Sequence, residues 1–171
     1  MTGKGSYGPF TDGGCQITLD GMKRDEALEF TILSRAECLD LLAASSVGRV
    51  GTTSGALPVV LPVNFVLNDE TIIFRTVPGT KLDSAVAGAV VAFECDGYDD
   101  EGQNGWSVML QGIATEVIDP SRLESFRNLP LEAWALDGAA HHYVTIDSTL
   151  VTGRRFRRIV GGKKAGGARK A

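Results

Sequence analysis

The residues with the clearest chemical potential lie where a predicted strand passes into a predicted helix. The stretch 74–82 reads FRTVPGTKL. Arg75 and Thr76 would leave the strand on opposite faces, and Lys81 would stand at the start of a helix whose first amides point outward. Arginine can grip a phosphate with two bonds, lysine adds a point charge, and a hydroxyl with backbone N–H groups completes the set. These are the parts of a phosphate site, and the same side chains would also suit a solvated rim.

Other reactive residue types lack the spacing that a site requires. His141 and His142 are adjacent, so a strand would send them to opposite faces, where they cannot share a metal ion. The acidic residues of 96–101 lack the fixed ligand spacing of a calcium loop, which favours a solvated turn. Cys38 and Cys95 are interpreted as small core residues. We therefore expect no metal site, and we assign no catalytic side chain.

Length and composition favour one soluble domain. The chain has 171 residues, of which 43% are apolar and 22% charged, as in ordinary globular proteins. No apolar run approaches the roughly 18 residues of a membrane span. Three cysteines without metal-type spacing fit free thiols in a reducing compartment. These observations predict a cytoplasmic protein that does not bind membranes.

Charge is divided unevenly along the chain. From Arg154 onward there are eight Lys and Arg residues and no acids, so the first 153 residues carry a net charge of −12. An acidic body repels nucleic acid, because phosphate binding requires a basic surface. We expect no nucleic-acid partner, and the basic end is interpreted as an unstructured tail that could touch an acidic partner.

The pattern of elements predicts an α+β fold that is mainly β. Ser34 and Glu37 form a capping-box pair that opens a helix ending near residue 45. Further helices are expected over 80–89 and 119–129. Strands are predicted over 48–53, 57–67, 71–77, 90–94, 106–118, 143–146 and 151–159, with a long acidic connection over 96–105. About six antiparallel strands with short flanking helices indicate a small closed barrel.

The ends of the chain are expected to lie outside this barrel. Residues 1–30 are Gly-rich and non-periodic and are predicted to be a flexible arm, and 161–171 a disordered basic tail. The domain proper is then 31–160. Within it, Pro58 and Pro62 cannot donate to a sheet, so the 57–67 strand must be bulged, bent or at an edge there. That strand is also apolar on both faces, so it has more apolar surface than one core can bury. This predicts a homodimer in which a second copy covers the remaining apolar surface.

Several short motifs occur in a characteristic order. They are GRVG at 48–51, LPVVLPVNF at 57–65, FRT at 74–76, GTKL at 79–82, VAFE at 91–94 and GWSV at 105–108. In this order the sequence resembles the pyridoxamine 5′-phosphate oxidase-like flavin proteins over about residues 31–160, and most closely their small flavin reductase-like branch. The resemblance implies a split β-barrel, a homodimer, and FMN in each of two clefts at the dimer interface.

The resemblance also implies a set of flavin contacts. It places the FMN phosphate on Arg75, Thr76 and Lys81, with the backbone of Leu82. It places Pro62, Val63 and Asn64 beside the isoalloxazine ring. Trp106 and Ser107 lie on the strand that the family uses to contact flavin, often from the partner subunit, although the oxidase itself carries an Arg-Gln pair there.

The predicted function is that of an FMN-dependent oxidoreductase acting on a small-molecule substrate or electron donor. The vitamin B6 enzyme holds its substrate phosphate with basic residues near its C-terminus, and the stretch 151–156 (VTGRRF) offers no defensible match. Oxidation of pyridoxamine phosphate is therefore not expected. Two alternatives stay open: a deazaflavin- or haem-binding barrel, and a non-catalytic dimeric binding module.

Overall fold

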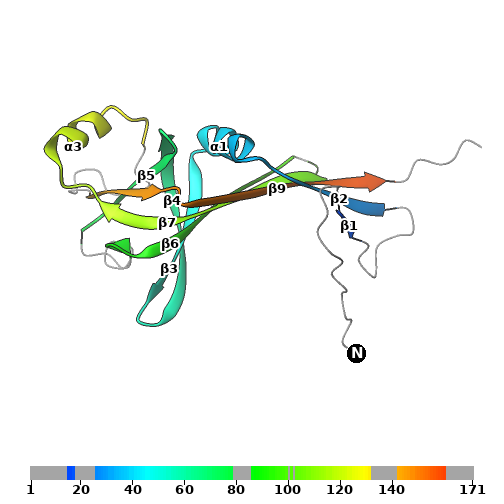
Figure 1. Cartoon of the computed structure of the whole chain (residues 1–171), viewed down its shortest axis with the longest axis horizontal. Coiled ribbons are helices and arrows are strands. Elements are labelled where there is room, and N and C mark those ends of the chain that lie inside the picture. The colour runs from blue at the N-terminus through cyan, green and yellow to red at the C-terminus, as the bar shows by residue number, and fades with distance from the viewer. Residues whose placement is uncertain are drawn as a thin grey trace, which may run out of the picture.

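Nine strands form one continuous antiparallel sheet that closes on itself (Figure 1). A computed structural model describes residues 15–17, 26–78, 86–99, 101, 103–131 and 142–160. The strands are β1 (Cys15–Ile17), β2 (Glu26–Ile32), β3 (Val47–Ser54), β4 (Leu57–Asn68), β5 (Thr71–Thr76), β6 (Val90–Tyr98), β7 (Asn104–Glu116), β8 (His142–Asp147) and β9 (Leu150–Val160). The helices described in full are α1 (Arg35–Ala43) and α3 (Pro120–Phe126).

The long strand β7 closes the barrel. The sheet order is β1-β2-β9-β7-β6-β3-β4-β5-β8, and β8 pairs again with β7 through Ala114↔Ile146 to Glu116↔Val144. Six strands thus form a ring, and the first half of β7 pairs with β9 instead. The predicted mainly β barrel is confirmed.

Beyond the ring, β9, β2 and β1 continue the sheet together with the hairpin end of β6 and β7, as a projection that we call the wing, on the opposite side of the barrel from α3 (Figure 1). On the wing each of two aromatic rings occupies the space above a glycine. A Cβ at Gly97 would lie 2.7 Å from the ring of Trp106, and one at Gly105 would lie 2.4 Å from that of Phe156. Each glycine is the direct cross-strand partner of its ring. A side chain at Gly97 would require the Trp106 ring to shift, and one at Gly105 would require a shift of the Phe156 ring and of the Gly97 carbonyl oxygen, 2.9 Å away.

Apolar side chains fill the ring. Phe65, Phe74 and Phe93 are fully buried, and the rings of Phe65 and Phe93 meet edge to face with centroids 4.8 Å apart. Helix α1 adds Cys38 and Leu42 to this core. The side chain of Ser34 accepts a bond from the Glu37 N–H while the Glu37 carboxylate accepts from the Ser34 N–H, so the predicted capping box is confirmed.

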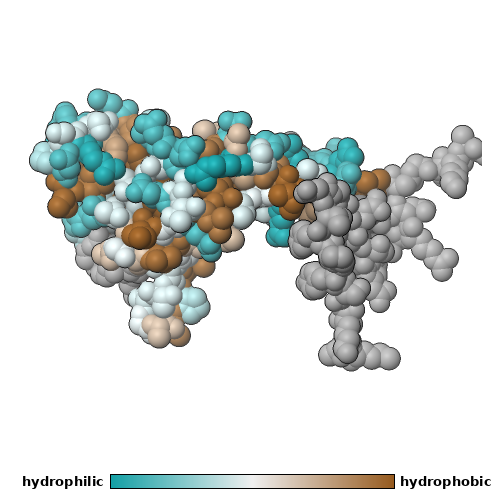
Figure 2. All heavy atoms as spheres, in the orientation of Figure 1, coloured by the Kyte–Doolittle hydropathy of each residue, from teal (hydrophilic) through white to brown (hydrophobic). Residues whose placement is uncertain are grey.

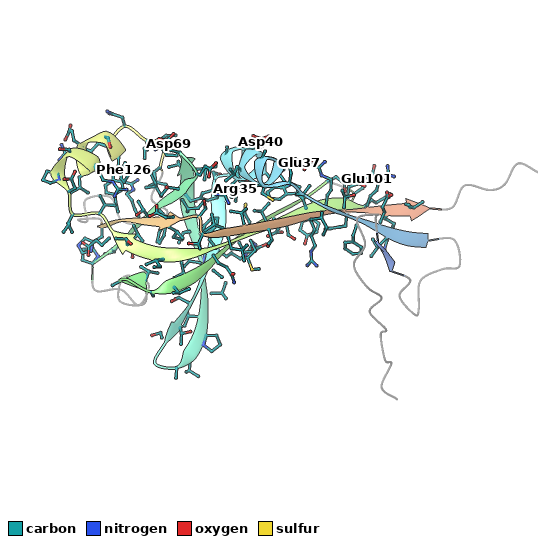
Figure 3. The ribbon with its side chains drawn as sticks, in the orientation of Figure 1. Arg35, Glu37, Asp40, Asp69, Glu101 and Phe126 are labelled. Carbon is teal, nitrogen blue, oxygen red and sulfur yellow. The ribbon has the colours of Figure 1, made fainter. Side chains whose placement is uncertain are left out.

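A smaller apolar cluster lies between α3 and the surface of β5 and β8 that faces away from the barrel core. Its buried members are Ile73, Val117, Phe126 and Leu131. Figure 3 labels Phe126 on α3, where its ring packs 5.7 Å from that of Tyr143. This cluster fixes the segment after α3 against β5 and β8. The helix ends at Phe126, three residues earlier than the sequence predicts.

The prolines of β4 lie where that strand is an edge. β4 pairs with β3 from Leu57 to Asn64, whereas β5 joins its other side only from Phe65 onward. Pro58 and Pro62 therefore need no donor on the β5 side. This confirms one of the three arrangements expected from the sequence.

Two boundaries differ from those predicted. β2 starts at Glu26, inside the predicted flexible arm of 1–30, because it pairs with β9 over its whole length. β6 continues to Tyr98 and β7 begins at Asn104, so the expected 96–105 connection is a short hairpin. Asp99 holds this hairpin by accepting bonds from the Gln103 and Asn104 N–H groups at 2.8 and 3.1 Å. The predicted domain limits at residues 30 and 160 stay predictions. Most of the predicted 80–89 helix lies outside the described residues.

The side of the sheet that faces away from the barrel core is called the outer face here. The described chain has ten exposed large apolar side chains, and eight lie on this face: Ile32, Val47, Val60, Val90, Tyr98, Met109, Ile113 and Leu150. Figure 2 shows apolar side chains gathered at the surface over β6 and β7. So concentrated an apolar surface is unusual for a monomer.

Candidate functional site

A pocket of about 590 Å³ lies over the start of β3 and the middle of β4. Its lining consists of Ser46, Val47, Asn64, Phe65 and the segment 129–131. Val47 and Asn64 are direct cross-strand partners, and the smaller apolar cluster holds 129–131 above them. The volume suits a small molecule or cofactor.

Arg75 stands beside this pocket. It follows Phe74 on β5, and Phe74 pairs with Phe65 of β4. Continuing this register by one residue places Arg75 opposite Asn64 on the outer face. Its Nη2 donates to the carbonyl oxygen of Leu131, and its guanidinium lies 6.0 Å from the centroid of the Tyr143 ring. The predicted phosphate-binding arginine therefore lies next to two of the residues that line the pocket, Asn64 and Leu131.

The Arg75 guanidinium has an unmet hydrogen-bonding requirement. Its Nε is buried and donates to no acceptor, and no described carboxylate forms an ion pair with it. A buried donor left unpaired costs about 1–3 kcal/mol, and an anionic acceptor would satisfy it with a charge-assisted bond. This arrangement suits an anionic ligand such as a phosphate.

Thr76 is separated from Arg75 by the sheet. It is 5% exposed, on the barrel side, opposite His142 of β8. Nδ1 of His142 lies 3.2 Å from a carboxylate oxygen of Glu116. Arg75 and Thr76 can thus reach one phosphate only at the end of β5, from its two faces. Lys81 and Leu82 lie outside the described residues, so the rest of the predicted phosphate site stays a prediction.

The predicted ring contacts divide between the two faces of β4. Val63 is 5% exposed and belongs to the barrel core, whereas Pro62 and Asn64 lie on the outer face. A ligand in the pocket can therefore meet the side chain of Asn64, and it can meet Val63 only through the backbone. The structure brings Asn64 and Arg75 together at one site.

Trp106 and Ser107 also point in opposite directions. The Trp106 ring covers Gly97 and packs against the barrel core, while the Ser107 hydroxyl lies on the outer face 3.4 Å from Nε of Arg154. Ser107 shares a cross-strand row with Asn64, but three strand spacings separate them, which is about 14 Å. Ser107 of the same protomer therefore lies outside the pocket.

Sequence reasoning missed the covering segment and a charged cluster. Residues 129–131 carry no motif, and they reach the site only through the packing of α3. Arg49 on β3 binds two carboxylates of β6, Glu94 at 3.0 Å and Asp96 at 2.5 Å. The Arg49 side chain lies on the outer face, directly across from Pro62. Neither feature has a local signal in the sequence.

A model for the family described as pyridoxamine 5′-phosphate oxidase matches residues 34–155. The chain belongs to this family. Within the described residues, no cluster of His, Cys, Asp and Glu could hold a metal ion, and no helix is long and apolar enough to cross a membrane.

Individual proteins of known sequence or structure support the assignment. The structure of a FAD binding protein from Mycobacterium smegmatis is 42% identical, with a TM-score of 0.68 over 74% of this chain and 98% of that one. A conserved protein of unknown function from Corynebacterium diphtheriae is 32% identical, with a TM-score of 0.63 over 74% and 98%. An uncharacterized protein of Mycobacterium tuberculosis is 40% identical over 76% of this chain and 88% of its own length.

Proposed function

We propose that the protein is a flavoprotein that binds FMN in the pocket beside Arg75, as a homodimer, and that it acts as a flavin-dependent oxidoreductase. The observation that carries the proposal is the buried Nε of Arg75, which has no acceptor within the described chain. A flavin phosphate would supply that acceptor. Nη2 already donates to the Leu131 carbonyl, so a phosphate on Nε would add a charge-assisted bond, and such bonds are about twice as strong as neutral ones.

The bound flavin would supply hydride or electron transfer, and the chain would supply binding and orientation. Arg75 would hold the phosphate, and Asn64 would exchange hydrogen bonds with the polar edge of the ring. The segment 129–131 would exclude water from one side of the cofactor. An arginine and an amide bind and orient without giving up protons at neutral pH.

The homodimer rests on the outer face. A second copy would cover the eight exposed apolar side chains that gather there. It would also explain a flavin contact from Ser107, because the Ser107 of the same protomer is about 14 Å from Asn64 along the sheet. Ser107 of the partner subunit could approach the pocket across the interface.

FAD is the second candidate cofactor, favoured by the 42% identity to a protein described as FAD binding. FAD carries the same riboflavin and first phosphate, so Arg75 would serve both. The two are separated by denaturing the purified protein and chromatographing the released cofactor. Release of FMN supports the proposal, and release of FAD replaces FMN by FAD in the same pocket.

The visible spectrum of the purified protein tests the cofactor class. Flavin gives bands in the blue and the near ultraviolet, a deazaflavin lacks that pattern, haem gives a Soret band, and an empty binding module gives no band. Any of the last three spectra would overturn the proposal if the purified protein also fails to take up flavin that is added to it. Mixing the loaded protein anaerobically with pyridoxine phosphate should leave the flavin oxidised.

Arg75→Ala tests the site itself. Losing a charged contact to phosphate should weaken FMN binding roughly 10- to 100-fold, measured by quenching of flavin fluorescence. Arg127→Ala is the matched control, because Arg127 lies at the exposed end of α3 and its ion pair within the described chain is with Glu124. Equal FMN affinity in the two variants would show that the phosphate binds elsewhere.

A further inference from the structure

Arg49 lies on the same outer face of the sheet as Arg75. It is the direct cross-strand partner of Pro62, and Pro62 stands two residues before the pocket residue Asn64 on the outer face. Arg75 and Arg49 are two strand spacings and one two-residue step apart, which is about 12 Å. Arg75 and Arg49 thus flank the pocket residues Asn64 and Val47 on the outer face.

Two carboxylates of the neighbouring strand fix the Arg49 guanidinium. Nη1 donates to Glu94 Oε2 at 3.0 Å and to Asp96 Oδ1 at 2.5 Å, and no other side-chain bond of Arg49 is formed within the described chain. The hydrogen bonds that Arg49 donates to Asp96 and then to Glu94 raise the pKa of Arg49 above its ordinary range. The guanidinium therefore stays charged and is oriented in advance.

The fixed guanidinium still has donors to offer. A guanidinium carries five N–H groups in one plane, and those of Nε and Nη2 are not engaged by the carboxylates. The Arg49 side chain is half exposed on the outer face of β3, where its two ion pairs hold the guanidinium toward β6. Its free donors can therefore bind a planar ligand that extends from the pocket across the outer face of β3.

We propose that Arg49 binds the acceptor edge of the flavin ring, at the opposite end of the site from the phosphate on Arg75. This inference rests on the proposed function. It assigns two different parts of one ligand to the two arginines: the phosphate to Arg75, and the carbonyl and ring-nitrogen acceptors to Arg49. Glu94 and Asp96 are then positioning residues, which act on the ligand through Arg49.

The two roles predict different responses to removal of the ligand phosphate. The dissociation constants of FMN and riboflavin are measured by fluorescence quenching for the parent protein, Arg49→Gln and Arg75→Gln. Arg49→Gln should weaken both ligands by the same factor, roughly 10- to 100-fold, because both carry the ring. Arg75→Gln should weaken FMN by a similar factor and leave riboflavin almost unchanged. Arg127→Gln is the control and should change neither.

Each outcome decides the assignment. If Arg49→Gln binds both ligands like the parent, or loses only FMN, Arg49 does not hold the ring and the inference fails while the proposed function stands. If the parent binds neither ligand, the proposed function fails as well.

Sedimentation and far-ultraviolet circular dichroism of the same samples test for an indirect effect. Loss of the dimer in Arg49→Gln would assign Arg49 to the subunit contact and overturn the inference. If Arg49→Gln does not fold, Arg49→Lys serves instead, because it keeps the charge toward Glu94 and Asp96 and loses the planar fork. Unchanged riboflavin affinity in that variant would equally overturn the inference.

Discussion

If the proposed homodimer forms through the outer face, Ile113→Glu is expected to separate it into folded monomers. Ile113 is 53% exposed on the outer face, where it is the direct partner of Val90 across β6 and β7. Burying a whole isoleucine side chain contributes about 1.5–3 kcal/mol, so covering the exposed half contributes about 1 kcal/mol. A two-fold interface contains the residue twice, which gives about 2 kcal/mol.

That free energy corresponds to about a thirtyfold weaker dimer, and the unpaired charge of the glutamate adds to the loss. The assay is sedimentation velocity over a range of protein concentrations. Ile118→Glu is the control, because Ile118 is 80% exposed but follows β7 and lies outside the outer-face rows. If the proposed dimer shares its flavin cleft between subunits, Ile113→Glu should also lose flavin, whereas Ile118→Glu should keep it.

Two results would refute this reasoning. An Ile113→Glu protein that sediments like the parent would show that the outer face is not the interface. Equal dissociation by Ile118→Glu would show that added charge, and not its position on the sheet, separates the subunits.

Gly112→Ala should destabilise the fold by about 1–3 kcal/mol in chemical denaturation, because its Cβ would lie 2.1 Å from the Asp147 carbonyl oxygen. Gly51→Ala is the control and should be near neutral, since its Cβ would meet Ala92 atoms only at 3.6 Å and beyond. Burial raises the pKa of the Cys95 thiol. The unfolded chain therefore releases that proton first, and the free energy of unfolding should fall once the pH exceeds the ordinary pKa of a thiol. Cys95→Ala should flatten that fall, and an unchanged pH profile would contradict the assignment.

Local patterns were sufficient for most of the barrel. The capping pair Ser34 and Glu37 and the alternation over 71–77 depend on neighbours in sequence, and both predictions hold in α1 and β5. The strand from Glu26 could not be predicted in this way, because its partner β9 lies more than a hundred residues away. The sequence predicts a loop at the end of β6, because this stretch is acidic and contains Gly97. The structure makes it a strand, since Asp96 pairs with Arg49 and Gly97 accepts a ring above it.

In the candidate site, too, some residues can be predicted from local sequence and others depend on tertiary packing. Arg75 and Asn64 were found because they belong to short motifs next to a turn or a proline, and β4 and β5 bring them side by side. The alternation of β4 sends Val63 into the core, which a motif alone does not show. The covering segment 129–131 and the row of Arg49 depend on tertiary packing, so no local signal marks them.

The ring-over-glycine pairs of the wing have a consequence for how related sequences can diverge. Gly97 with Trp106, and Gly105 with Phe156, are cross-strand partners in which one member must be small because the other is large. A side chain gained at Gly97 is accommodated most readily when the Trp106 ring is replaced by a smaller side chain, and one at Gly105 when Phe156 is replaced and the Gly97 carbonyl also shifts. Across homologues these two pairs should therefore change together, and an alignment deep enough to measure covariation should recover the pairing of β6, β7 and β9 from these four positions.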